Sequence, residues 1–373
     1  MKSNAIWGCS LLALVVGTGC AAKPLGTEPT MDEVKLATAE LQKINGASCD
    51  HALAASMFDA KVFTIRAFEG NEAFGSPQVV KEIESVGLLS KVFCGPEQLK
   101  LLRLQTVGGK PKALFRRWGG TGVGYYRFDF LKTQGKVRVI DWVDFAQGDS
   151  ASGSMRAMMA ANTGDLANAK ANGEAIAQIG ELMRSGKRAE ALTALDALPP
   201  TQQAAKPIRL LRVSASASLP PDEYTVVLDK FAKDFGDDPA MGMILLDQHF
   251  LANRYDDVFA IIAKLRVLIG EDSALNLFEA NTLLKRKGPG DVAKAETLLL
   301  AGLKLDPDAE NLLSVMMDVR VAQGNAAAAA EAIRAFHKVT QKTLSRSAMR
   351  SVPADMMASA AFAELDREGV LVP

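Results

Sequence analysis

The chain has 373 residues, with 43 basic and 43 acidic side chains and a formal net charge of zero. Balanced charge without a basic block excludes the usual electrostatic surface for nucleic acid, so we expect no nucleic-acid partner. Only 6% of the residues are aromatic, whereas alanine and leucine are common, which favours a largely helical protein. The length exceeds what one hydrophobic core usually holds and predicts two domains.

The first twenty residues have the pattern of a targeting signal. A lysine precedes an apolar run over residues 11–16, which is too short to span a bilayer, and the sequence VGTGC follows, ending at Cys20. This ending resembles the lipobox of bacterial lipoproteins, although Gly17 stands where that family usually has an aliphatic residue. The resemblance implies that residues 1–19 are a signal peptide and that Cys20 is acylated. Ordinary cleavage without a lipid is the alternative.

A lipid on Cys20 implies a location for the protein. Ala21, and not aspartate, follows the cysteine. In Gram-negative lipoproteins this implies sorting to the outer membrane, where the protein would face the periplasm or the cell surface. Several acyl chains anchor a protein more firmly than a single myristoyl group does. Residues 20–30 hold proline, glycine and threonine without periodicity and are predicted to be a tether.

Two of the four cysteines remain after this processing. Cys9 leaves with the signal peptide and Cys20 takes the lipid, so Cys49 and Cys94 stay in an oxidising compartment and are predicted to form a disulfide. Closing a loop of about 45 residues would stabilise the fold by roughly 3–4 kcal/mol. A pair of buried free thiols is the alternative.

Residues 31–148 are predicted to form an α+β domain. Apolar residues recur at helical spacing in the first part of this range, over residues 31–44, 51–58 and 79–86. The pattern then changes to alternation, which predicts four strands over residues 101–107, 111–118, 123–133 and 136–145. The segment Thr133-Gln134-Gly135 is predicted to be the hairpin turn between the last two.

Helices followed by an antiparallel meander resemble the ketosteroid-isomerase-like cone fold, also called the nuclear-transport-factor-like fold. The likeness lies in the order of the elements and in the segment YYRFDFLKTQGKVRVIDWVDF, which resembles the last two strands of that cone. The resemblance implies a ligand pocket at the mouth of the cone.

Asp141 interrupts an apolar row in the last predicted strand. Strict alternation would place five residues on one face of that strand, namely Val137, Val139, Asp141, Val143 and Phe145. A buried carboxylate needs a partner, and Arg116 or Arg117 could form an ion pair while Tyr126 donates a hydrogen bond. These four residues are the candidate pocket. The alternatives are a structural ion pair between strands and a bulge that turns Asp141 outward.

The motifs of common catalytic sites do not occur. The three histidines, His51, His249 and His337, are far apart in the sequence, and there is no HExxH, CxxC or GxSxG. We therefore expect no catalytic residue, no metal and no cofactor. The cone resemblance alone would make Asp141 a general base and Tyr126 an oxyanion donor.

Residues 149–164 are rich in glycine, serine and alanine and are predicted to link the first domain to a helical domain over residues 165–373. Within the helical domain, a turn residue precedes a small or apolar residue by five positions at Gly186/Ala191, Asn253/Val258, Gly290/Ala295 and Gly324/Ala329. The intervals are 67, 37 and 34 residues. The first interval is nearly twice the others, which predicts a further unit with its turn near Leu219-Pro220-Pro221.

A period near 34 residues with paired helices resembles the tetratricopeptide repeat. The likeness is closest in the second helix of the unit DVAKAETLLLAGLKLDPDAENLL, although the large aromatic residue expected early in each first helix is missing. A plain helical bundle is the alternative. The tail after Thr340 is predicted to cap the array.

Stacked helical pairs present a concave surface that commonly binds peptide segments or partner proteins. We therefore expect a lipid-anchored scaffold for protein–protein interaction, with a protein partner on the concave helical face. The alternative is a carrier or sensor of a small apolar ligand in the cone. An isomerase-like enzyme is the least supported function.

Overall fold

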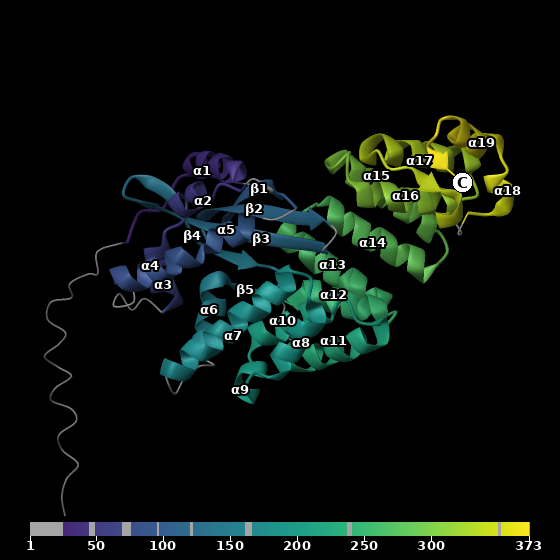
Figure 1. The fold of residues 1–373 in the computed structure, drawn as a ribbon. Coiled ribbons are helices and arrows are strands. Elements are labelled where there is room, and N and C mark those ends of the chain that lie inside the picture. The colour runs from purple at the N-terminus through teal and green to yellow at the C-terminus, as the bar shows by residue number, and fades with distance from the viewer. Residues whose placement is uncertain are drawn as a thin grey trace, which may run out of the picture.

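The computed structural model describes residues 25–44, 49–68, 76–94, 97–119, 122–160, 166–236, 241–349 and 352–372. The predicted signal peptide and Cys20 lie outside these ranges. An antiparallel sheet with covering helices forms the N-terminal half, and the remainder of the chain is mainly helical (Figure 1). The prediction of an α+β part followed by an all-α part is thus confirmed at this level.

Five helices precede the sheet: α1 (Met31–Lys43), α2 (His51–Ser56), α3 (Ala60–Ala67), α4 (Pro77–Val86) and α5 (Leu88–Phe93). The sequence pattern predicts α1, α2 and α4 but misses α3 and α5. A capping box starts α1, because the Thr30 hydroxyl accepts from the Glu33 backbone N–H while the Glu33 carboxylate accepts from the Thr30 N–H at 2.9 Å. Part of the predicted tether is fixed, since Thr27 pairs with Lys132 of the sheet.

The strands follow one another in a meander: β1 (Leu99–Val107), β2 (Lys110–Gly119), β3 (Gly122–Thr133), β4 (Lys136–Asp144) and β5 (Asp149–Ser150). The first four confirm the predicted strands to within two residues at each end. Between β3 and β4, Gln134 and Gly135 have φ values of 51° and 78°. A two-residue hairpin turn with positive φ at both positions matches the twist of the strands, which explains the tight connection.

Each face of the sheet is covered by its own hydrophobic cluster. The first cluster packs side chains of α1 and α5 against one face, and includes Val34, Leu41, Phe93, Phe115, Phe128, Val139 and Trp142. The second cluster packs the opposite face against helices far along the chain, and includes Leu114, Tyr125, Phe145, Leu246, Ile261, Leu265 and Leu275. Helices of the C-terminal half therefore supply the second layer on the sheet.

A β-bulge in β4 overturns the predicted row of inward residues. Asp129 pairs with Asp141 and Phe130 pairs with Val139, so Ile140 is an additional residue in β4. Because an extra residue reverses the alternation, Val139 belongs to the first cluster whereas Phe145 belongs to the second. The prediction that Val137, Val139, Asp141, Val143 and Phe145 share one face is wrong.

The segment predicted to be a linker instead contains β5 and α6 (Ala151–Ala160). Helix α6 packs against β4 and α3, and Ser152 in its first turn is buried. The described part of residues 149–164 thus belongs to the layer around the sheet.

Successive helices pack against one another through the rest of the chain: α7 (Leu166–Arg184), α8 (Arg188–Asp196), α9 (Pro200–Gln203), α10 (Lys206–Ser216), α11 (Pro221–Phe235), α12 (Gly242–Leu251), α13 (Tyr255–Ile269), α14 (Ser273–Arg286), α15 (Asp291–Leu305), α16 (Glu310–Ala322) and α17 (Ala326–Thr340). The turn predicted near Leu219-Pro220-Pro221 lies between α10 and α11. The helices that follow each turn begin at Arg188, Pro221, Tyr255, Asp291 and Ala326, so they recur every 33 to 36 residues.

The C-terminal segment covers the end of this helical half with β6 (Leu344–Ser345), a 3-10 turn η3 (Arg346–Ala348), α18 (Ala354–Met357), α19 (Ala360–Arg367) and β7 (Leu371–Val372). Phe362 and Leu365 of α19 are buried against Ala329 and Ile333 of α17. Met356 is buried in this cluster as well. Within the described residues, every helix is too short or too polar to cross a membrane.

Candidate functional site

The four residues of the candidate pocket do not converge. Arg116 and Arg117 are neighbours on β2 and therefore point to opposite faces of the sheet. Arg117 lies on the same side as Tyr126, whereas Arg116 lies on the side of α14 and Asp141 contacts α6. The predicted ion pair between Asp141 and either arginine does not form.

Arg116 binds the helical half of the chain. Its guanidinium donates to Asp272 and to the Ser273 hydroxyl, both at 2.6 Å, and to Asp306 at 2.7 Å. The Tyr125 hydroxyl donates to the second oxygen of Asp272 at 2.6 Å. Arg116 and Asp272 are 3% and 2% exposed, so this is a buried ion pair and not an open site.

The same aspartate also starts α14. Asp272 is the N-cap residue of that helix, and its carboxylate accepts from the Ala274 N–H at 3.0 Å. Burial tends to lower the pKa of Arg116, but the carboxylates of Asp272 and Asp306 outweigh it and raise that pKa. Burial and the adjacent Asp272 carboxylate raise the pKa of Tyr125 well above its ordinary value. The network therefore clamps the sheet to α14 and α15.

Asp141 caps α6 and has no open side. Its carboxylate accepts from the Ser152 N–H at 3.1 Å, from the Ser152 hydroxyl at 2.5 Å and from the Trp142 N–H at 2.9 Å. Burial raises the pKa of Asp141, and these donors act against that rise. The residue is 3% exposed, so its partners give it a structural role in holding α6 on the strand.

Arg117 and Tyr126 are in contact, but the carboxylate beside them is Asp144 and not Asp141. The Arg117 guanidinium lies 5.7 Å from the centre of the Tyr126 ring, and Tyr126 is the cross-strand partner of Asp144. Burial raises the pKa of Asp144 to about 6, and burial together with the Asp144 charge raises the pKa of Tyr126. Perturbed groups of this kind mark functional sites and also structural polar networks.

Strict alternation in β4 predicts that Asp141 lies beside Tyr126. With the extra residue in β4 taken into account, Asp144 and not Asp141 comes beside Tyr126. The presence of Asp144 three positions after Asp141 in the same strand was the signal in the sequence for this second carboxylate.

Aromatic side chains fill the sheet face that the carrier hypothesis assigns to an apolar ligand. Phe93, Phe115 and Phe128 are fully buried, and their ring centres lie 5.3 to 5.6 Å from one another. Trp142 extends the group, with its ring 6.1 Å from that of Phe128. This packing is typical of a hydrophobic core.

A groove of about 400 Å³ lies between α8, α9, α10 and α11. Apolar side chains form much of its lining, among them Val213, Val226, Val227 and Phe231, and Val226 is 68% exposed. Three cations also line it, namely Arg209, Arg212 and Lys230. Arg212 pairs with Asp196 at 2.7 Å and Arg209 with Asp234 at 3.2 Å, whereas Lys230 forms no ion pair to any described residue.

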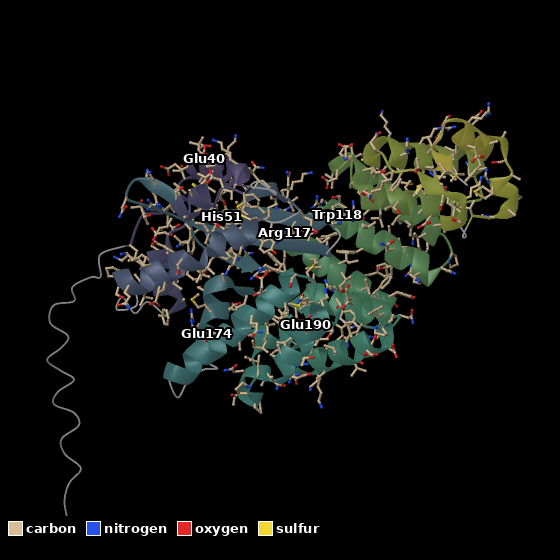
Figure 2. All side chains as sticks on the ribbon, in the orientation of Figure 1. Glu40, His51, Arg117, Trp118, Glu174 and Glu190 are labelled. Atoms are coloured by element: carbon tan, nitrogen blue, oxygen red, sulfur yellow. A yellow bond between two sulfur atoms is a disulfide. The ribbon has the colours of Figure 1, made fainter. Side chains whose placement is uncertain are left out.

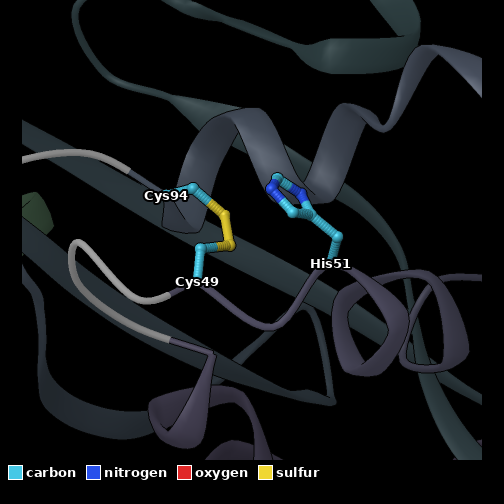
Figure 3. Close-up of side chains that lie close together, drawn as sticks. All are labelled: Cys49, His51 and Cys94. Atoms are coloured by element: carbon cyan, nitrogen blue, oxygen red, sulfur yellow. A yellow bond between two sulfur atoms is a disulfide. The ribbon is translucent and has the colours of Figure 1, made fainter.

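Cys49 and Cys94 are joined in a disulfide, with their Cα atoms 5.3 Å apart. The predicted pairing is thus present in the structure. His51 lies beside the two sulfur atoms (Figure 3), and one ligand atom from each of the three residues lies within 4.8 Å of the others. His51 is predicted to be an isolated helical histidine, although the spacing Cys49-Asp50-His51 was a signal for this cluster.

Trp118 contributes apolar packing where the two halves meet. Trp118 lies at the end of β2 that is nearest α14 (Figure 2), and it packs against the hydrophobic cluster of α14, α15 and α16. The Arg116 guanidinium lies 4.7 Å from the centre of the Trp118 ring. The junction therefore combines apolar packing with the buried ion pairs.

Comparison of the chain with protein-family models, with curated proteins and with solved structures found no match. The function is therefore inferred from the residues and their geometry.

Proposed function

We propose that the protein is a lipid-anchored scaffold whose helical half binds a segment of a partner protein. The observation that carries the proposal is the groove between α8 and α11, where the exposed Val226 borders an apolar lining. Grooves between packed helices commonly accept peptide segments through a few apolar anchors.

The repeating helices support a tetratricopeptide-like array. Helices α11, α13, α15 and α17 each have 15 residues and begin at nearly constant intervals. In such an array each helical pair contacts its neighbours and the stack presents an extended binding surface. Within the helical half, we place partner binding in the groove between α8 and α11, and no longer on the whole concave face that the sequence predicts.

The charge around the groove indicates the chemistry of the partner. Lys230 lines it without an ion-pair partner among the described residues, while Arg209 and Arg212 already have carboxylate partners. A segment that places an apolar side chain beside an aspartate or glutamate would fill the lining and pair with the Lys230 ammonium group. We assign no catalytic role to the groove.

The lipid anchor is part of the proposal. The lipobox-like sequence at Cys20 would hold the protein at the outer membrane, with the helical half facing the periplasm or the cell surface. A partner in the envelope would then be bound at a fixed place.

The test is in-cell cross-linking followed by affinity capture. The parent protein is compared with Cys20→Ala, which lacks the acylated residue, and with two variants that each add one exposed glutamate. Val226→Glu alters the groove, while Val267→Glu alters a valine of α13 that is 86% exposed and outside the groove lining.

We expect the parent and Val267→Glu to capture the same discrete envelope protein, and Val226→Glu to lose it. Capture only by the acylated form would support the anchor as well. Equal capture by Val226→Glu and Val267→Glu would contradict the groove as the binding site.

A further inference from the structure

Cys49, His51 and Cys94 form a compact group outside the proposed binding groove. Cys49 precedes α2, His51 is the first residue of α2, and Cys94 ends α5. The two cysteines are half-buried against the first hydrophobic cluster, whereas His51 is exposed. The imidazole makes no hydrogen bond or ion pair to the described part of the chain.

The three side chains have the chemistry of a site for a thiophilic metal ion. Two thiolates and one imidazole are common ligands of Zn²⁺, with Zn–S distances of about 2.3 Å and Zn–N distances of about 2.0 Å. Ligand atoms around such a tetrahedral ion are roughly 3.5–3.8 Å apart. The His51 nitrogen lies within 4.8 Å of both sulfur atoms and therefore needs to approach them by at most about 1 Å, whereas the two sulfur atoms need to move apart once their bond is reduced.

We propose that this group is a redox-gated metal site, which is closed as the Cys49–Cys94 disulfide and binds one zinc-like divalent ion when the two cysteines are reduced. The three protein ligands would leave a fourth position for water. The proposal is independent of the helical groove and of its partner.

The gating step balances with a dithiol as the reductant. The dithiol is oxidised to a disulfide and gives two electrons and two protons to the protein. The sulfur–sulfur bond between Cys49 and Cys94 breaks, and both cysteines become thiols. The metal ion then displaces the two thiol protons into solvent, and His51 binds through a neutral ring nitrogen. While the disulfide is intact, neither sulfur is a thiolate and the site cannot form.

The test is a Co²⁺ titration of the full chain carrying Cys9→Ser and Cys20→Ser, so that Cys49 and Cys94 are the only thiols. The protein is either oxidised or reduced with a phosphine, whose own oxidation to the phosphine oxide takes its oxygen from water. We expect the reduced protein to bind one Co²⁺, with thiolate-to-cobalt charge-transfer absorption and the visible bands of a tetrahedral site. The oxidised protein should show neither.

Two histidine substitutions, His51→Ala and His337→Ala, provide the test and its matched control. His51→Ala should weaken metal binding by at least about tenfold. Loss of a residue that only orients a metal ligand typically costs about this much, and loss of the ligand itself should cost no less. His337→Ala, on α17, should leave the affinity unchanged. An equal affinity of the parent and His51→Ala, or a reduced protein without the charge-transfer band, would overturn the proposal.

Reduction also removes a cross-link, so folding is measured in parallel. Thermal unfolding of the reduced protein is recorded with and without Zn²⁺, and the same concentration of Zn²⁺ should raise the Tm of the parent by more than the Tm of His51→Ala. A reduced protein that unfolds and gains no stability from Zn²⁺ would overturn the proposal as well.

Discussion

A single guanidinium joins the two halves of the chain at their junction. Arg116 holds Asp272 and Asp306, which cap the start of α14 and the end of α15. All three side chains are largely shielded from water, so the loss of one charge would leave the others without compensation. The network therefore stabilises the fold only when all three charged side chains are present.

Arg116→Ala should lower the free energy of unfolding by about 3–5 kcal/mol, because it leaves the Asp272 carboxylate buried and without its cationic partner. Urea unfolding monitored by circular dichroism measures the loss. The matched control is Arg184→Ala, which breaks an exposed pair with Glu181 and should change stability by less than about 1 kcal/mol. Similar effects of the two substitutions would contradict the assignment of a buried clamp.

Asp144 should make stability depend on pH in the opposite sense to an ordinary surface carboxylate. Burial raises its pKa from 3.8 to about 6, so between these values the folded state holds more protons than the unfolded state. Stability contributed by the protonated form is therefore lost as the pH rises from about 4 to about 6.

Asp144→Asn should remove this dependence. At pH 7.5 the variant should be more stable than the parent by about 1–2 kcal/mol, which is less than the full effect of the pKa shift because solvent still reaches part of the side chain. At pH 4 the gain should largely disappear. Urea unfolding at pH 4, 6 and 7.5 tests this, and a difference that is independent of pH would refute it.

The sequence predicts the type of many site residues but not their partners. It identifies Asp141 as a carboxylate that needs donors, and the structure supplies them from Ser152 and Trp142. It does not predict that Arg116 binds Asp272, because 156 residues separate them and no local pattern links the two. The proximity of His51 to Cys94 is missed for the same reason, because the two residues come from different helices and no local pattern links them.

Among the elements, the strands are the best predicted. Alternation over β1 to β4 is strong, and Gln134-Gly135 marks the hairpin turn. The bulge in β4 is only an alternative at the sequence level, because Val139, Ile140 and Val143 fit either register. Helices α3 and α5, of eight and six residues, are missed, although α2 is equally short and is predicted.

Gly302 tests how closely the helices approach one another. A β-carbon at this position of α15 would lie 3.0 Å from a methyl carbon of Leu312 on α16, and Leu312 is fully buried. Gly302→Val should therefore lower the free energy of unfolding by about 1–3 kcal/mol through overpacking.

Gly180 of α7 is the matched position for this test. A β-carbon there would have only the flexible end of Arg184 within 4 Å, at 3.7 Å. Gly180→Ala should raise the free energy of unfolding by about 0.5–1 kcal/mol, because alanine loses less conformational entropy than glycine in a helix. Thermal or urea unfolding of both variants should give effects of opposite sign; a stabilising Gly302→Val would contradict the close packing.

At the scale of the whole molecule, the sheet and the helices are less separate than the sequence predicts. Composition and the change of period correctly divide the chain into an α+β part and a helical part. Residues 149–160 of the predicted linker form β5 and α6, because glycine, serine and alanine suit the start of this helix as well as a flexible connection. The second face of the sheet is covered by α12, α13 and α14, a contact between segments more than 100 residues apart.

This arrangement fixes the helical half on the sheet while the groove between α8 and α11 remains open. A scaffold benefits from such rigidity, because an ordered binding surface loses little entropy when a partner binds. In the proposed function, the groove would bind the partner and the junction would hold the groove in a fixed orientation.

The most direct measurement is site-specific photo-cross-linking in cells. A photoreactive amino acid replaces Val226 in one strain and Val267 in another, and the adducts are identified by mass spectrometry. We expect one discrete adduct from position 226, cross-linked to a partner segment that has an apolar residue beside a carboxylate, and no such adduct from position 267. The same adducts at both positions, or none at position 226, would contradict it.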